Sequence, residues 1–142
     1  RDVERSRGLG DVYKRQPYYK GCIKGKDISV IRYNRDVIQR HVCVFEGFVD
    51  FLSYLMLHKK GDYHVCVDIP TDFLVMNSIS NLKKCLLELE QYIFIHCYLD
   101  NDLAGQKTVE TIAGLYGIKV IDHSKNYYNY KDLNDYLRGK RR

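Results

Sequence analysis

The sequence predicts an α/β fold with a mostly parallel central sheet of about four strands flanked by helices. Two observations support this prediction. Short apolar runs, several of them uninterrupted by a polar residue, alternate along the chain with stretches of helical length and periodicity. Uninterrupted runs are typical of strands buried on both faces, which usually pair in parallel. With 142 residues, the chain is long enough for one domain with a sizeable core and too short for two.

Three elements are expected in the first half of the chain. A short strand lies within residues 27–33 and ends in a turn, and the apolar run of residues 41–46 forms a strand buried on both faces. A helix spans residues 48–59 and stops near Gly61. Its apolar face is expected to consist of Val49, Leu52, Tyr54, Leu55 and Met56.

The second half repeats the alternation of strand and helix. In order, the elements are a strand at 73–76, a helix at 78–91, a strand at 92–99, a helix at 103–116 and a strand at 118–121. Gly117 supplies the stop signal for the second of these helices. A polar loop then leads to a last short segment at residues 131–137.

The ends of the chain differ from its middle in charge and pattern. Residues 1–16 show no periodicity and are expected to be a non-native or disordered leader, so that the natural protein begins further upstream. Residues 17–40 form a strand-and-turn lead-in, 41–137 the core, and 138–142 a basic tail. The two ends together carry nine basic and three acidic side chains, so of the net charge of +5 the middle contributes −1. The net charge is therefore weak support for a nucleic-acid partner.

Cysteine usage and hydropathy indicate in which cellular compartment the protein is expected. The five cysteines include no C-x-x-C pair, and we expect buried thiols in a reducing cytoplasm rather than disulfides or a zinc site. No apolar segment approaches the ~20 residues that span a bilayer, and the N-terminus lacks a signal-peptide core. We therefore expect a soluble cytoplasmic protein with no membrane partner.

Acidic side chains follow several of the expected strands. Glu46 ends the first buried strand, Asp100 and Asp102 follow the third, and Asp132 comes after the loop that leaves the fourth. In an open parallel sheet, ligands bind beyond the carboxyl ends of the strands. Gathering carboxylates there costs about 1 kcal/mol per pair at ~4 Å even in water. Oxygen ligands without histidine or cysteine favour Mg²⁺ or Mn²⁺ as the cation that offsets this repulsion.

The turn after the third strand has two interpretations. The small residues Ala104 and Gly105 allow the helix start to approach the sheet, leaving room for a ligand beside the carboxylates. Alternatively, Asp100 and Asp102 merely cap the helix that begins at residue 103, since aspartate is a favoured N-cap. Spacing alone leaves both interpretations open.

Three motifs, each placed just beyond an expected strand, are more specific in combination. They are FEGFVD at residues 45–50, LDNDLAG at 99–105 and KDLNDYL at 131–137. Together they resemble the TOPRIM domain of primases and topoisomerases, and most of all the primase-like TOPRIM proteins of bacterial mobile elements. The resemblance implies a TOPRIM (Rossmann-like) fold and Mg²⁺-dependent nucleotidyl or phosphoryl transfer on nucleic acid, in primer synthesis for DNA replication.

The resemblance also implies roles for individual acids. Glu46 matches the glutamate of the family that acts in acid/base work at the reacting phosphate or shares in metal binding. Asp100 and Asp102 match the two metal ligands of the D-x-D motif. Asp132 and Asp50 match further acidic positions of the third and first motifs, and all four aspartates are therefore candidate metal ligands.

Three lysines are candidate contacts for the substrate. Lys131, within the third motif, is expected to touch a nucleotide phosphate. Lys107 and Lys125 lie near the strand ends and are candidate contacts for a nucleic-acid backbone, with a solvated surface lysine as the alternative for each. The implied partners are a single-stranded DNA template and nucleoside triphosphates, with a helicase or missing domains of the same protein as further partners.

Two other function classes stay open. Nucleases with this fold use the same acids to hydrolyse phosphodiesters, although their third motif differs, and a non-catalytic module binds nucleotide or a partner through the same crevice. Complete primases resemble a larger assembly with a zinc-binding module and a basic subdomain, neither of which is found in this sequence. The chain is therefore expected to be a fragment of a longer protein.

Overall fold

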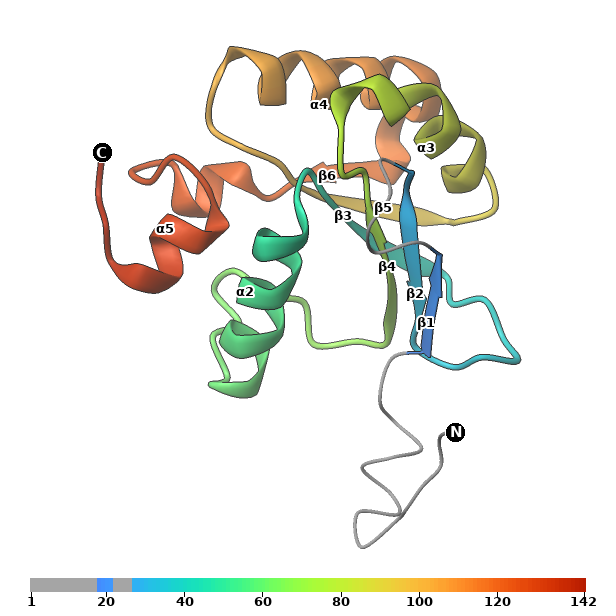
Figure 1. Cartoon of the computed structure of the whole chain (residues 1–142), viewed down its shortest axis with the longest axis horizontal. Helices are drawn as coiled ribbons and strands as arrows, with labels where there is room; N and C mark the ends of the chain where they lie inside the picture. Colours follow the sequence, from blue (N-terminus) through green and yellow to red (C-terminus); the bar gives the residue numbers. More distant parts are fainter. Residues whose placement is uncertain (1–17, 22–26) are drawn as a thin grey trace, which may run out of the picture.

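The computed structural model of the chain describes residues 18–21, as backbone, and residues 27–142 (Figure 1). The expected leader at 1–16 lies outside the described residues. Six strands form one sheet in the order β1-β2-β4-β3-β5-β6. Their bounds are β1 Tyr18–Gly21, β2 Ser29–Arg32, β3 His41–Phe45, β4 Thr71–Val75, β5 Phe94–Tyr98 and β6 Val120–Asp122. The last four of these strands pair in parallel, as predicted, and β1 and β2 add an antiparallel edge beside β4.

Helices cover both faces of the sheet (Figure 1). On one face lie α2 (Phe48–Lys59) and α5 (Leu133–Arg138), and on the other lie α3 (Leu82–Leu89) and α4 (Leu103–Tyr116). Three 3₁₀ turns lie between these elements, η1 (Ile79–Asn81), η2 (Gly117–Lys119) and η3 (Ser124–Tyr127). The helix expected at 78–91 is shorter because its first turn is the 3₁₀ turn η1, capped by Ser78. The arrangement is an α/β fold, as the sequence predicts.

The core consists of two apolar clusters separated by the sheet. Alternate side chains of one strand point to opposite faces, so Val42 and Val44 pack beneath α3 and α4 while Cys43 and Phe45 pack beneath α2 and α5. All four are fully buried. This two-sided burial explains why the strand at 41–45 is a continuous apolar run in the sequence.

Helix α2 buries only part of the predicted face, Tyr54 and Leu55. Its inward residues include Phe51, Tyr54 and Leu57. The predicted face is wrong for Val49, Leu52 and Met56, which are 58%, 47% and 56% exposed. The helix is apolar nearly all round, so hydrophobic spacing does not select one rotation about its axis. Tertiary contacts select it, because the carboxylate of Asp50 accepts a hydrogen bond from the backbone N–H of Asn134 in α5, at 3.1 Å.

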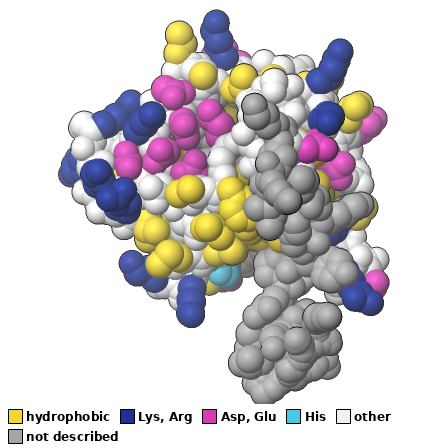
Figure 2. Space-filling model, viewed as in Figure 1, with side chains coloured by type: hydrophobic (Ala, Val, Ile, Leu, Met, Phe, Trp, Pro, Cys, Tyr) yellow, Lys and Arg dark blue, Asp and Glu magenta, His cyan; other side chains and the backbone are white. Residues whose placement is uncertain are grey.

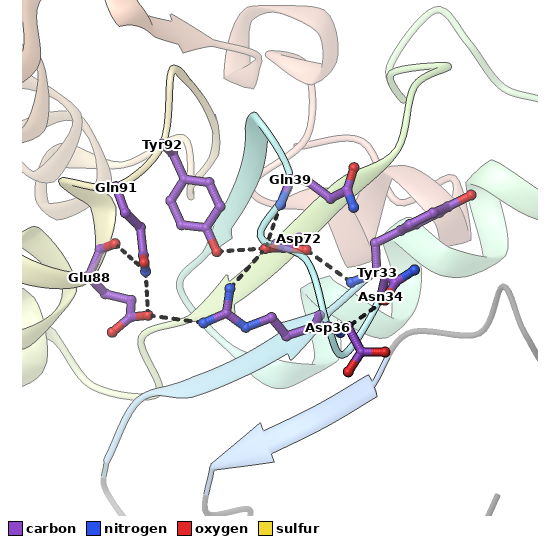
Figure 3. A network of polar contacts seen from close by, with 9 residues as sticks. Tyr33, Asn34, Asp36, Gln39, Asp72, Glu88, Gln91 and Tyr92 are labelled. Carbon is purple, nitrogen blue, oxygen red and sulfur yellow. Dashed lines mark hydrogen bonds and ion pairs between the residues drawn. The ribbon is translucent and has the colours of Figure 1, made fainter. Parts of the chain in front are cut away.

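A buried ion pair lies at the amino end of β4 (Figure 3). Asp72, fully buried at the start of β4, lies 3.4 Å from a guanidinium nitrogen of Arg32. Its oxygens also accept hydrogen bonds from the backbone N–H groups of Tyr33 and Gln39 and from the hydroxyl of Tyr92, the last at 2.8 Å. A buried carboxylate is tolerated when it is paired and fully hydrogen-bonded in this way. The network ties the β2–β3 connection to β4 and to the segment after α3, so its role is structural.

Four cysteines lie in the described part of the chain, and all are buried free thiols. Burial raises the pKa of Cys43 and of Cys85 to about 12, so these groups stay protonated and unreactive. None of the helices among residues 27–142 has the length and hydropathy that a bilayer-spanning segment requires.

Candidate functional site

The order in which the chain connects the strands indicates where a ligand is expected, at the carboxyl end of β3. The chain passes from β3 to β4 on one side through α2, and then crosses to β5 on the other side through α3. Strand order reverses at such a point, and the crevice beyond the carboxyl ends of the strands is where ligands bind in open α/β sheets. Glu46 directly follows β3, and Asp100 follows Leu99 at the end of β5. Figure 2 shows acidic side chains gathered on one part of the molecular surface.

Three carboxylates from separate elements meet in this crevice. One oxygen each of Asp50, Asp100 and Asp132 lies within 4.8 Å of the other two. Asp50 comes from the first turn of α2, Asp100 from the turn after β5, and Asp132 from the N-cap of α5. The structure therefore brings together one acid from each of the three sequence motifs.

Two of these acids are held by backbone donors, whereas other oxygens nearby have no partner. Asp50 accepts the N–H of Asn134 at 3.1 Å, and Asp132 accepts the N–H of Asp135 at 2.8 Å. Within residues 27–142, Oδ1 of Asp100 and Oε1 of Glu46 are buried and receive no hydrogen bond. Buried acceptors without donors cost free energy unless another group satisfies them.

The acids of the crevice resist ionisation. Burial and the neighbouring carboxylates of Glu46, Asp50, Asp132 and Asp102 raise the pKa of Asp100 to about 7. Burial and Asp132 raise the pKa of Asp50 to about 6, against the lowering effect of the Asn134 N–H. Burial also raises the pKa of Glu46, with the Asp100 N–H and Lys131 acting in the opposite direction. Crowded acids of this kind are typical of sites that bind a cation or move a proton.

The donor set fits a hard divalent cation. All three grouped ligand atoms are carboxylate oxygens, which Mg²⁺ and Mn²⁺ prefer, and within residues 27–142 no histidine or cysteine belongs to the group. A bound cation would satisfy the unpartnered oxygen of Asp100 and offset the mutual repulsion of the carboxylates. The residues present therefore suit the Mg²⁺ or Mn²⁺ that the sequence motifs imply.

Asp102 has a different placement from Asp100. It is exposed, and Oδ1 of its side chain accepts the N–H of Gly105 at 2.8 Å, as the N-cap of α4. Of the two interpretations of the D-x-D turn, capping applies to Asp102 and does not apply to Asp100. Asp102 is absent from the carboxylate group among residues 27–142. Its charge nevertheless contributes to the raised pKa of Glu46 and of Asp100.

Gly105 provides the close approach of helix to sheet that the sequence predicts. A β-carbon at this position would overlap the backbone oxygen of Asp100. Any side chain would therefore push the start of α4 away from the turn that carries Asp100. Ala104, the other small residue of the turn, is exposed and has no comparable role.

Asn101 joins the second motif to the third, a role that the sequence did not predict. Its side-chain amide lies 3.0–3.2 Å from the carbonyl oxygens of Ser124, Tyr127 and Tyr130, and donates to them. Its backbone N–H donates to the carbonyl of Lys131 at 2.7 Å. The loop that leads to Asp132 is thereby tied to the turn that carries Asp100. The only signal in the sequence is the position of Asn101 between two motif aspartates.

The three candidate lysines are all exposed, and the charge of one of them affects an acid of the site. Lys131 lowers the pKa of Glu46 by its charge. Lys107 lies in the second turn of α4, and Lys125 lies in η3. Among the described residues neither of these two forms an ion pair.

Aromatic residues near the site pack rather than project into solvent, with one exception. Tyr127 is 1% exposed, and its hydroxyl donates to the carbonyl of Leu99 at 2.8 Å. Tyr130 packs edge-on against Tyr136. Tyr128 is 62% exposed. The loop therefore covers the edge of the sheet, and among Tyr127, Tyr128 and Tyr130 only Tyr128 is mostly exposed to solvent.

Comparisons with known proteins agree with the fold. The chain is similar in fold to the primase fragment of the bacteriophage T7 primase-helicase protein, with a TM-score of 0.50 and 20% identity over 80% of this chain and 52% of that one. It is also similar to a chain of a complex of T7 lagging-strand DNA polymerase with primase domains bound to an RNA/DNA hybrid and dTTP. There the TM-score is 0.51, with 20% identity over 78% of this chain and 54% of that one.

The chain thus spans about half the length of these solved structures, and at 20% identity the likeness concerns the fold. No curated protein matches the sequence. A family model described as Toprim-like matches residues 43–137, which contain all three motifs and all three grouped carboxylates. The chain belongs to the Toprim-like family, as the sequence motifs predicted.

Proposed function

We propose that this chain is the catalytic core of a primase-like protein and supports metal-dependent nucleotidyl transfer during primer synthesis on a single-stranded DNA template. The observation that supports the proposal most is the convergence of Asp50, Asp100 and Asp132 beside the unpartnered oxygen of Glu46. The fold shared with phage primase fragments supports the choice of primer synthesis. In this proposal the chain is a fragment of a longer protein of a bacterial mobile element, working with a helicase or further domains.

In the proposed mechanism, Asp50, Asp100 and Asp132 would hold Mg²⁺ or Mn²⁺, and Asp102, which lies outside that group, would supply a further acidic ligand. When bound, the ion neutralises charge on the attacking and leaving oxygens of the transferred phosphoryl group. Because burial raises the pKa of Asp100 to about 7 and of Asp50 to about 6, these acids release protons as they take up a cation.

Glu46 and the lysines complete the proposed machinery. The carboxyl group of Glu46 has a raised pKa and a buried oxygen with no donor, which suits it to take up a proton from the attacking hydroxyl. Lys131, whose charge reaches Glu46, contacts a phosphate of the nucleotide. Lys107 and Lys125 contact the backbone of the template strand.

Calorimetric titration of the 142-residue chain with Mg²⁺ and Mn²⁺, with and without a nucleoside triphosphate, tests the metal site. We expect binding by the wild type, its loss in the Asp100→Asn/Asp132→Asn variant, and its retention in Asp68→Asn, which removes an exposed charge outside the group. Equal binding by wild type and the double variant would contradict the assignment of the ligands.

Incubation with a labelled single-stranded template and nucleoside triphosphates separates the function classes. A primase initiates or extends a strand, whereas a nuclease shortens the template. The nuclease is the second candidate because the same three carboxylates suit hydrolysis of a phosphodiester equally well. A chain that binds metal but changes neither strand would support a non-catalytic binding module.

A further inference from the structure

The basic tail of the chain folds back onto the turn between Asp100 and Asp102. The backbone N–H of Arg142 donates to the carbonyl of Asn129 at 2.9 Å. Its guanidinium group donates to the carbonyl of Tyr128 at 3.1 Å and to that of Asn101 at 2.7 Å. Asn101 separates Asp100 from Asp102 in the second motif. The tail, which the sequence pattern sets apart from the folded body, is therefore in contact with the turn that carries Asp100.

The segment that ends in this contact is strongly basic. Residues 125–142 carry six cations and two acids, and both acids, Asp132 and Asp135, lie in the first turn of α5 or at its cap. The six cations are Lys125, Lys131, Arg138, Lys140, Arg141 and Arg142. All six are exposed, and among the described residues none forms an ion pair with a carboxylate. In Figure 2, basic side chains flank the acidic cluster on one side.

The position of these cations matters because the crevice itself repels phosphate. Five carboxylates lie in or beside it, those of Glu46, Asp50, Asp100, Asp102 and Asp132. A strand that approaches them meets unfavourable potential, which neighbouring cations offset when they lie within about 10 Å, the screening length at moderate salt. The contact of Arg142 with Asn101 brings the tail to the residue next to Asp100.

We propose that the cations of η3, α5 and the tail form a basic rim that binds the phosphodiester backbone of the single-stranded nucleic acid on which the site acts. We call this set, Lys125, Arg138, Lys140, Arg141 and Arg142, the basic rim; Lys131, which lies between η3 and α5, is kept for the nucleotide. Arg142 anchors it through backbone carbonyls, which leaves Arg138, Lys140 and Arg141 free for phosphates. The inference rests on the proposed function in that both need a nucleic-acid strand at the acidic crevice.

Salt-dependent binding of a fluorescent deoxythymidine oligonucleotide, long enough to span the rim, tests the proposal. The test variant is Arg138→Gln/Lys140→Gln/Arg141→Gln in the full chain, with Arg142 retained to hold the tail. Each lost phosphate contact lowers the slope of log K against log salt by about 0.7 for a single strand, so three lost contacts lower it by about 2. At 100 mM salt we expect the variant to bind at least about tenfold more weakly than the wild type.

A second triple variant removes the same charge elsewhere. Arg40→Gln/Lys59→Gln/Lys60→Gln neutralises exposed cations that directly precede β3 or lie at the C-terminal end of α2, at the end of the sheet opposite the acidic site. We expect this variant to bind the oligonucleotide nearly as the wild type does. Equal losses in the two triple variants, or no binding by the wild type at low salt, would overturn the proposal.

Two further measurements test whether weaker oligonucleotide binding by the rim variant reflects lost contacts to the strand rather than a change in metal binding, folding or nucleotide binding. Mn²⁺ binding and the thermal melt of the rim variant should match the wild type, because neither the carboxylates nor the core is altered. Binding of ATP without metal tests the other source of phosphate. If ATP binding depends on the rim and oligonucleotide binding does not, the rim serves the nucleotide and the assignment to the strand is wrong.

The rim and the proposed function fail in different ways. Rim-dependent strand binding without primer synthesis by a longer, complete protein would leave the rim in place and reject the primase. Primer synthesis that is unaffected by loss of the rim would reject the rim and leave the proposed function in place.

Discussion

The backbone N–H of Asn101 donates to the carbonyl of Lys131 at 2.7 Å, so the turn that carries Asp100 and the loop that carries Asp132 are held as one unit. The side-chain amide of Asn101 strengthens this link by donating to three more carbonyls of the same loop. The two acids come from motifs far apart in sequence, and their approach depends on this junction.

Replacement of Asn101 should therefore weaken both the fold and the metal site. Asn101→Ala leaves three loop carbonyls without this donor, and we expect a loss of about 1–3 kcal/mol in the free energy of unfolding. Asn101→Asp should cost more, because its carboxylate would face those carbonyls without a proton to donate. Asn129→Ala is the matched control, since no described residue bonds to its side chain. Urea denaturation measures all three, and an Asn101→Asp variant as stable as wild type would contradict the argument.

Two glycines of the same helix should respond in opposite ways to alanine. Gly105→Ala places a β-carbon against the backbone oxygen of Asp100, and neither group is on a flexible side chain, so α4 must shift. We expect a loss of several kcal/mol, in the range of severe overpacking. The β-carbon of Gly114→Ala meets nothing within 4 Å, and this variant should gain about 0.5–1 kcal/mol from helix propensity. Thermal melts of the two variants that shift by equal amounts in the same direction would contradict the close approach.

Substitutions of the two aspartates of the D-x-D turn should have opposite effects on the free energy of unfolding. Asp100→Asn removes a partly buried charge that its neighbours repel, so at pH 8 without metal we expect a gain on the order of 1–2 kcal/mol in the free energy of unfolding. Asp102→Ala removes the cap of α4 and should cost about 1 kcal/mol. Urea denaturation in the presence of a chelator measures both. A clear loss of stability in Asp100→Asn would indicate that its carboxylate, too, is held by the fold.

The elements of this fold could be predicted from sequence where local signals were strong. Helix α4 spans Leu103–Tyr116 as expected because Asp102 caps its start and Gly117, with a φ of 62°, ends it. The buried parallel strands were predictable because they are apolar on both faces. The rotation of α2 was not, since its sequence is apolar nearly all round and contacts with α5 decide which face is buried.

The candidate site was only partly accessible from sequence for a similar reason. Strand ends locate Glu46 and Asp100, because the residues just after each parallel strand gather at the carboxyl edge of the sheet. Asp50 lies inside a helix, and only the family motif singled it out. The hydrogen bonds of Asn101 and the return of the tail to the site depend on how a loop folds, and no spacing rule predicts them.

A row of three histidines makes the stability of the fold sensitive to acid. Nδ1 of His41 lies 2.9 Å from Nε2 of His96, and Nδ1 of His96 lies 2.8 Å from Nε2 of His123. Each pair has room for one hydrogen, so in each pair one ring donates and the other accepts. Burial, reinforced by the neighbouring histidines, lowers the pKa of His96 to about 4, and burial lowers that of His123 to about 4.

Between pH 6.5 and about 4 the unfolded chain therefore binds protons that the folded chain excludes. The free energy of unfolding should fall as the pH falls through this window, by at most about 1.4 kcal/mol per pH unit for each histidine. Asp50 and Asp100 act in the opposite direction, because their raised pKa values make the folded state bind more protons over part of the same range. The net slope of the wild type alone is therefore not diagnostic.

The difference between variants isolates the histidines. His96→Gln removes one titrating group, so the stability advantage of wild type over this variant should shrink as the pH falls from 6.5 toward about 4. His64→Gln, at an exposed position, should give a curve parallel to the wild type. Urea denaturation at closely spaced pH values measures all three curves. A constant difference between wild type and His96→Gln across the window would mean that His96 takes up its proton as readily in the folded state as in the unfolded one.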